Sequence, residues 1–223
     1  MIYIKNPIEI IIVYIICLIL SYFVDNRIKS SYNKVNLKKY TTIAIYFIIL
    51  ISDNLLYAKY GMEPKTFRYM LLIAIMVELS VIDCYTQNVY DIDVLSGILL
   101  EGILLFITTK IGYQISVTDH LVGLLVGFSV PYLIAVLTKS LGLGDVGVYS
   151  LCSLTLGLNY SIYLIGLSFV LAGIFTISAS AMRGRLLRGA IPFVPFISVA
   201  TFLIMMSEFK LLNIYIYTVK SLI

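Results

Sequence analysis

The stretch VGVYSLCSLTLGLNYSIYLIGLSFVLAGIFTISASAM, residues 146–182, carries no charged side chain over 37 residues. As a single helix it would measure about 55 Å at about 1.5 Å per residue, whereas the hydrocarbon core of a bilayer is about 30 Å thick. It is therefore expected to form two membrane spans. The break between them is expected at Gly157-Leu158-Asn159, because Gly and Asn tolerate a positive φ.

The whole chain has the composition of a membrane protein. Of its 223 residues, 61% are hydrophobic and 13% are charged, and the mean hydropathy is +1.01. Soluble domains are about 45–50% apolar and about 25% charged, so a soluble globular domain is excluded. The net charge of +4 is too dispersed to indicate nucleic-acid binding. Three cysteines without a CxxC pair and a single histidine predict no metal site, and no cofactor is expected.

Eight membrane-spanning helices are predicted, which makes the fold an all-α polytopic one. Helices are expected because lipid offers no partners to backbone groups and no alternating barrel pattern is present. Three regions follow: a two-span segment over 1–66, a core of about six spans over 67–208, and a tail over 209–223. Besides the two spans within 146–182, the apolar stretches lie near 8–24, 40–58, 67–82, 94–109, 119–138 and 190–208.

The loops between these spans predict an N-terminus on the outer side of the membrane. Nine of the sixteen Lys and Arg residues then fall on inner loops, including both dense clusters, and basic loops favour the inside. These clusters are also expected to contact anionic membrane lipid. The inner loops are 25–39, 83–93, 139–145 and 183–189.

Two aspartates are thereby predicted at the same membrane face although 62 residues separate them. Asp83 follows the third span, and Asp145 follows two glycines, Gly142 and Gly144, which let a backbone approach closely. Two neighbouring carboxylates share a proton, so one can activate water while the other polarises a peptide carbonyl. The pattern indicates aspartic-protease chemistry, which needs no metal ion.

The ordered motifs resemble those of the type IV prepilin peptidases, polytopic GxGD aspartic proteases of the cytoplasmic membrane. Asp83 matches the first catalytic aspartate of that family, and Asp91 matches an Asp or Asn found eight positions later. The segment 142–146, GLGDV, is similar to the second motif. The segment 191–196, IPFVPF, is similar to the proline–phenylalanine segment that opens the last span. The resemblance covers residues 72–206.

The resemblance implies a peptidase with Asp83 and Asp145 as the catalytic pair and with Gly142, Gly144 and Asp91 in supporting positions. Its substrates would be prepilins or pseudopilins, which carry a short basic leader before an apolar helix. Cleavage would occur at the cytoplasmic face of the inner membrane. The two glycines are expected to leave room for the extended substrate backbone.

Two positions and one loop depart from the family pattern. Tyr90 replaces a proline, and Gly147 stands where a lysine is common. Members that also methylate the new N-terminus carry a larger insert after the first span, often with cysteines. Here loop 25–39 has no cysteine, so proteolysis without N-methylation is expected.

The sequence leaves two other interpretations of the function open. Tyr90-Asp91 resembles a Tyr-Asp motif of the presenilin and signal-peptide-peptidase group, in which case Asp91 and Asp145 would form the pair. The Pro-Ala-Leu motif of that group is absent. Acidic residues within spans, such as Glu78 and Glu101, would alternatively serve a small ion-coupled transporter. The oligomeric state is not indicated.

Overall fold

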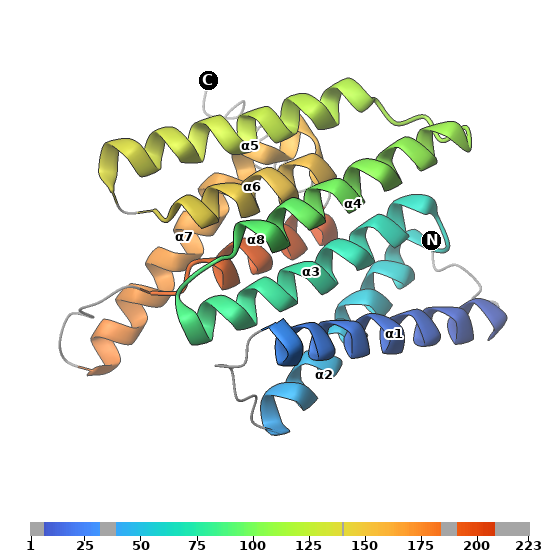
Figure 1. Cartoon of the computed structure of the whole chain (residues 1–223), viewed down its shortest axis with the longest axis horizontal. Coiled ribbons are helices and arrows are strands. Elements are labelled where there is room, and N and C mark those ends of the chain that lie inside the picture. Colours follow the sequence, from blue (N-terminus) through green and yellow to red (C-terminus); the bar gives the residue numbers. More distant parts are fainter. Residues whose placement is uncertain (1–6, 32–38, 140, 184–190, 208–223) are drawn as a thin grey trace, which may run out of the picture.

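The computed structural model describes residues 7–31, 39–139, 141–183 and 191–207 (Figure 1). Within these ranges the chain forms eight helices, which confirms the predicted all-α fold. The loop residues 32–38 and 184–190 and the tail from 208 lie outside the described part of the chain. The helices are α1 (Pro7–Ser31), α2 (Lys39–Tyr60), α3 (Pro64–Thr86), α4 (Asp91–Lys110), α5 (Val117–Thr138), α6 (Leu143–Leu156), α7 (Leu158–Arg183) and α8 (Val194–Ser207).

Five of these helices, α1, α2, α4, α5 and α7, are long and apolar enough to cross a membrane. The other two apolar helices, α6 and α8, have 14 residues each. Such a helix measures about 21 Å, less than the bilayer core. The chain is therefore a multi-pass membrane protein in which shorter helices complete the bundle.

The predicted break in the long apolar stretch lies between α6 and α7. Gly157 has φ +89°, a backbone conformation that favours glycine, and its N–H donates to Ser153 O at 2.9 Å. Other boundaries differ from the sequence expectation. α1 continues past Asp25 to Ser31, so the charges expected in loop 25–39 begin within a helix. Likewise α4 begins at Asp91, within the expected loop 83–93.

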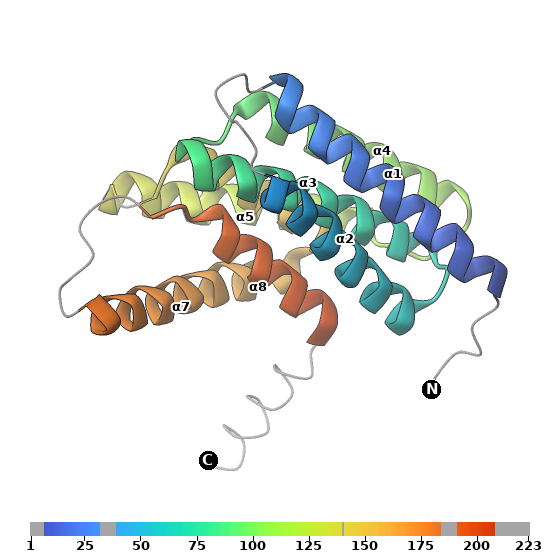
Figure 2. The ribbon, with the colours of Figure 1, turned by 90° about the horizontal axis from the view of Figure 1, so that it is seen from below.

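The helix α3 lies at the centre of the bundle and contacts α1, α2, α4, α6 and α8. Seen from below, α8 packs against α2, α3 and α7 (Figure 2). The core side chains come from all parts of the chain, with Leu72, Leu79, Val148 and Ile197 fully buried. α3 thus provides the frame on which the more peripheral helices are placed.

The helices α5 and α6 approach closely through glycine. A Cβ atom at Gly127 would lie 2.3 Å from Ser153 Oγ, and one at Gly123 would lie 2.8 Å from the Ser153 carbonyl oxygen. Small residues four apart permit such contact between membrane helices. This contact fixes α5 along one side of α6.

Candidate active site

Asp83 lies in the last turn of α3 and meets the N-terminus of α8. Its side chain is buried, with 4% of the residue surface exposed. Its Oδ2 accepts a hydrogen bond of 3.0 Å from the backbone N–H of Val194, the first residue of α8. The first N–H groups of a helix lack intrahelical partners and favour a negative charge. The segment 191–196 therefore reaches Asp83 through its backbone, across 111 positions of sequence.

Asp145 lies in the first turn of α6, three residues after the N-cap residue Gly142. Its Oδ2 accepts a hydrogen bond of 3.1 Å from the Gly142 N–H. An acidic residue at this position returns to the N-cap backbone, as in the second half of a capping box. The carboxylate is thereby oriented by its own helix, whereas Asp83 is oriented by another one.

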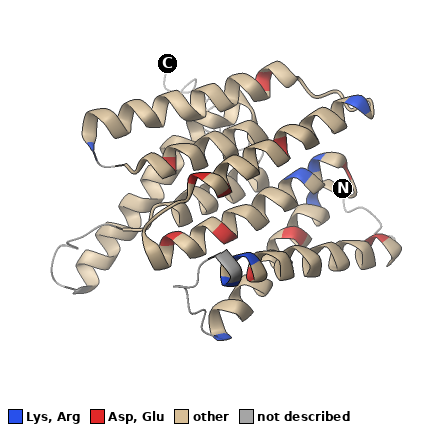
Figure 3. Ribbon diagram, in the orientation of Figure 1, with Lys and Arg blue, Asp and Glu red and all other residues tan. Residues whose placement is uncertain are grey.

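The two carboxylates interact electrostatically. Burial and then the negative charge of Asp83 raise the pKa of Asp145 from 3.8 to about 6. Burial also raises the pKa of Asp83, while the backbone hydrogen bonds from Val194 and Phe193 lower it. Acidic positions at the end of α3 and the starts of α4 and α6 fall in one part of the ribbon (Figure 3). Such a pair titrates as a unit and retains one proton more readily than isolated carboxyls.

Gly144 brings the first turn of α6 against the connection between α3 and α4. A Cβ atom at Gly144 would lie 2.7 Å from Val89 Cβ and 3.2 Å from Val89 O. The space that a side chain would need is thus filled by Val89 of the same chain. At Gly142 a Cβ atom would lie 3.1 Å from Asp145 Oδ2. The close packing of the first turn of α6 against the connection between α3 and α4 brings Asp145 toward the end of α3, where Asp83 lies.

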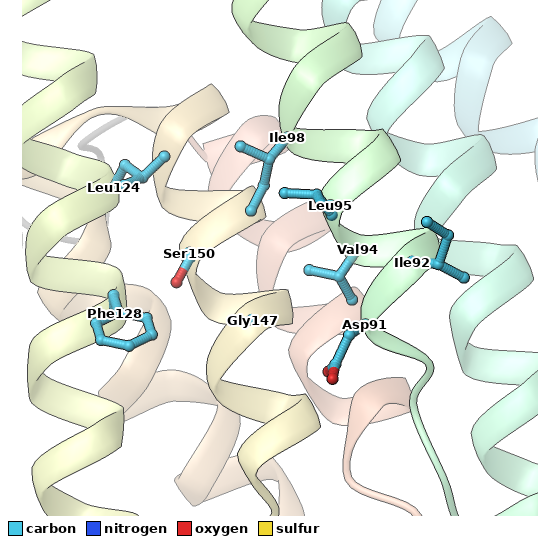
Figure 4. Close-up of a pocket in the computed structure, with 9 residues that line it drawn as sticks. All are labelled: Asp91, Ile92, Val94, Leu95, Ile98, Leu124, Phe128, Gly147 and Ser150. Carbon is cyan, nitrogen blue, oxygen red and sulfur yellow. The ribbon is translucent and has the colours of Figure 1, made fainter.

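Asp91 is the first residue of α4 and lies at the edge of this site rather than within it. Its side chain is exposed and lines a cavity of about 600 Å³ together with residues of α4, α5 and α6 (Figure 4). Among the described groups, the charge of Asp83, but not that of Asp91, contributes to the raised pKa of Asp145. The electrostatic interaction of Asp145 is therefore with Asp83 and not with Asp91.

Sequence reasoning missed an ion-pair cluster behind the site. Arg27 on α1 lies with its Nε 3.0 Å from Glu78 Oε1 on α3, and its Nη2 donates to Asp93 on α4. Arg27 is expected from the sequence to set topology and contact lipid, but it instead connects three helices. Glu78 thus joins α3 to α1. The signal available in the sequence was the presence of the two acids Glu78 and Asp93 in apolar segments, since buried carboxylates require a partner.

Further from the site, other intramembrane acids are also paired. Glu101 is fully buried, and its Oε2 lies 3.2 Å from Arg68 Nε, which joins α4 to α3. Cys17 Sγ donates to Asp53 Oδ2 at 3.6 Å between α1 and α2. Within the described residues, no cluster of three or more His, Cys, Asp or Glu side chains is placed to hold a metal ion. These pairs join helices without reaching the Asp83–Asp145 pair.

Residues 70–177 match the model of the type IV leader peptidase family. The match covers just under half of the chain and includes Asp83, Asp91 and Asp145, and it indicates a protease. No curated protein and no solved structure matches the chain significantly. The helices α1, α2 and α8 lie outside the matched segment, although Arg27 and Val194 from α1 and α8 contact groups within it.

Proposed function

We propose that this chain, whose residues 70–177 belong to the type IV leader peptidase family, is a membrane-embedded aspartic endopeptidase with Asp83 and Asp145 as its catalytic pair. The observation that carries this proposal is that two buried carboxylates from α3 and α6 lie close enough to interact: burial and then the negative charge of Asp83 raise the pKa of Asp145. A general base and a general acid of the same residue type need this kind of electrostatic coupling.

The arrangement supports a water-activating mechanism. The ionised carboxylate of the pair takes a proton from a water molecule, and that water attacks the peptide carbonyl carbon. The protonated carboxyl donates its proton toward the carbonyl oxygen, so that the tetrahedral intermediate forms without a separated charge. The backbone N–H groups of Val194 and Gly142 hold the two carboxylates in orientation. Because the pair shares its proton, the base and acid roles belong to the pair and not to one residue.

The substrates proposed are prepilins or pseudopilins, with a basic leader on the cytoplasmic side and an apolar helix in the membrane. This proposal rests on the family match and on the position of both aspartates beyond the apolar spans 67–82 and 146–156. Cleavage at the inner membrane face requires the site at a helix end rather than at mid-bilayer. The absence of cysteine from residues 25–39 supports cleavage without N-methylation.

The experiment compares wild-type protein with Asp83→Asn, Asp145→Asn, Asp91→Asn and Asp119→Asn in detergent. Each is incubated with a prepilin-type peptide and a methyl donor, and the products are identified by mass spectrometry. Asp119 is the matched control, since it lies in the first turn of α5 beside Gly157, at the far end of α6 from Asp145. We expect cleavage at the leader junction by wild type and Asp119→Asn. The Asp83→Asn and Asp145→Asn proteins should lose it by about 10³-fold or more.

Other outcomes of this experiment would change the assigned catalytic pair or the proposed function. Loss of cleavage with Asp91→Asn but not with Asp83→Asn would reassign the pair to Asp91 and Asp145, as in the presenilin-like alternative. A product carrying an added methyl group would contradict protease-only activity. If wild type cleaves no leader peptide but transports ions in proteoliposomes, the buried acids Glu78 and Glu101 become candidate ion sites instead.

A further inference from the structure

The helices α4 and α5 leave an apolar groove between them. Both pack on α6, while contact between α4 and α5 themselves is sparse (Figure 1). Two cavities, of about 600 Å³ and about 280 Å³, lie along this gap. Because both cavities are lined by Ile98 of α4 and Leu124 of α5, they follow one another along the same two helices. We call the two together the α4–α5 groove.

Each helix contributes one face to the groove. Its floor is formed by Gly147, Ser150 and Leu154 of α6, which recur at helical spacing. Two of these residues are small, which gives the groove depth. In the wall formed by α4, a Cβ atom at Gly102 would meet no heavy atom within 4 Å, so the groove is open beside this residue.

The dimensions of the groove match part of a membrane helix. Along α4 it runs from Asp91 to Phe106, which corresponds to about 22 Å at about 1.5 Å per residue. Its lining is almost entirely hydrophobic. Figure 4 shows Leu124 and Phe128 of α5 facing Leu95 and Ile98 of α4 across the α6 floor.

One end of the groove begins at the candidate active site. Gly147 lies two residues after Asp145, and the Asp91 carboxylate stands at this same end (Figure 4). Asp91 is exposed, and it is the one charged residue in the lining of either cavity among the described residues. A ligand that fills the groove would therefore place its apolar part along α4 and a cation next to Asp91.

We propose that the α4–α5 groove binds the apolar helix of the substrate that follows the scissile bond, while Asp91 contacts a basic residue of the leader. This inference rests on the proposed peptidase function. Charge and continuity select a peptide as the occupant. A lipid in the groove would place its headgroup phosphate against the Asp91 carboxylate, whereas a basic leader is complementary to that charge. A peptide would also pass from the groove directly to Asp83 and Asp145.

The first test fills the groove without disturbing the fold. Gly102→Leu introduces a side chain into open space, and Gly173→Leu on α7 is the matched control, since a Cβ atom there also meets nothing within 4 Å. Both exchanges raise helix propensity equally. With a substrate that includes the apolar segment, Gly102→Leu should raise KM at least tenfold and leave kcat unchanged. With a peptide truncated shortly after the scissile bond, both variants should behave as wild type.

The second test reverses the charge at the end of the groove that lies next to the candidate active site. Asp91→Lys should raise KM for a substrate with a basic leader, and a substrate whose leader lysines are replaced by glutamate should recover at least part of the loss. A third measurement does not require cleavage. In the Asp145→Asn protein, a photoreactive phenylalanine analogue in the apolar segment of the peptide should crosslink to α4 or α5, and Gly102→Leu should abolish this crosslink.

The outcomes separate this inference from the proposed function. If wild type cleaves the peptide but Gly102→Leu and Gly173→Leu have equal KM values, the groove assignment is overturned and the peptidase assignment stands. If no peptide is cleaved but the crosslink forms and depends on Gly102, the groove binds the peptide and the proposed function fails. Crosslinking of a photoreactive lipid in the groove, undiminished by the peptide, would overturn the inference in favour of a lipid site.

Discussion

Asp83 and Asp145 obtain their properties from different neighbours, although they are the same residue type. Asp83 is held by the first backbone N–H of α8, and Asp145 by the N–H of its own N-cap residue, Gly142. Burial raises the pKa of both carboxyls. Burial of both carboxyls, together with their mutual repulsion, keeps one proton on the pair at mildly acidic pH, where isolated aspartates are ionised.

The rate of cleavage should depend on this shared proton. The pKa of Asp145 is raised from 3.8 to about 6, so the pair retains a proton below about pH 6 and loses it as the pH rises through that value. We expect kcat/KM of the free enzyme to fall on the alkaline side with an apparent pKa near 6, and to fall again at lower pH when both carboxyls are protonated. Steady-state assays over a broad pH range measure the profile. A rate that stays constant from pH 6 to pH 9 would contradict the coupled pair.

Gly144 offers a second prediction at the residue scale. In Gly144→Ala the added methyl group would lie 2.7 Å from Val89 Cβ, so the two segments must separate. Overpacking of this kind costs about 1–3 kcal/mol, and here it also displaces Asp145 relative to Asp83. We expect a lower midpoint of thermal unfolding and about tenfold or more slower cleavage.

The matched variant for this prediction is Gly144→Ala combined with Val89→Gly, which removes the Val89 Cβ atom that the new methyl group would meet. It should recover most of the lost stability and activity. If the double variant is as impaired as Gly144→Ala alone, Val89 is not the constraint, and Gly144 is needed for another reason, such as room for the substrate backbone.

At the scale of elements, α8 is stabilised at both ends by other helices. Asp83 accepts from its first N–H, and Lys59 of α2 donates to Met205 O at 2.8 Å and to Met206 O at 2.9 Å. A carboxylate at the N-terminus and an ammonium at the C-terminus both match the helix dipole. A helix of 14 residues is thus fixed between α2 and α3, and its N-terminus reaches the candidate site.

The helix α1 is joined to the core through Arg27, and this contact can be tested by stability. Arg27→Gln removes the cation that pairs with the buried acids Glu78 and Asp93, and the loss of one partner of a buried ion pair typically costs about 3–5 kcal/mol. Lys29→Gln is the control, since the half-exposed Lys29 pairs with Asp25 and its loss should cost about 0–1 kcal/mol. Thermal unfolding of the full chain in detergent gives the comparison.

The compensated variant Arg27→Gln, Glu78→Gln, Asp93→Asn removes the acids together with the cation. It should unfold at a higher temperature than Arg27→Gln alone, because amides are less costly to bury than unpaired carboxylates. Equal unfolding temperatures for Arg27→Gln and Lys29→Gln would mean that the ion pairs do not hold α1 to the core.

At the scale of the whole molecule, the orientation in the membrane can be read from Cys84. This residue is exposed at the end of α3, next to Asp83, whereas Cys17 and Cys152 are buried. If the catalytic end faces the cytoplasm, a membrane-impermeant thiol reagent should label Cys84 in inside-out vesicles but not in intact cells.

The control for orientation is Cys84→Ser combined with Ile111→Cys. Ile111 is exposed and follows α4 at its other end, so this protein should be labelled in intact cells instead. Labelling of Cys84 from the outside would invert the topology and place the candidate site on the wrong face for a cytoplasmic leader.

The sequence by itself determined the helices, the break at Gly157 and the family motifs around Asp83 and Asp145. These features depend on local properties: the length of apolar runs, the backbone freedom of glycine, and the spacing of residues in a motif. Loop charges and the alternation of spans further predicted that both aspartates lie at one face.

Only the tertiary structure decided which helices touch. Four features connect residues that are distant in sequence. They are the contact of Asp83 with Val194, the ion pairs that join α1 to the core through Arg27, the packing of Val89 against Gly144, and the groove between α4 and α5. Apolar helices in lipid gain no hydrophobic energy by choosing one neighbour over another. Their arrangement depends instead on close packing and on the pairing of buried polar groups, which no single stretch of the chain contains.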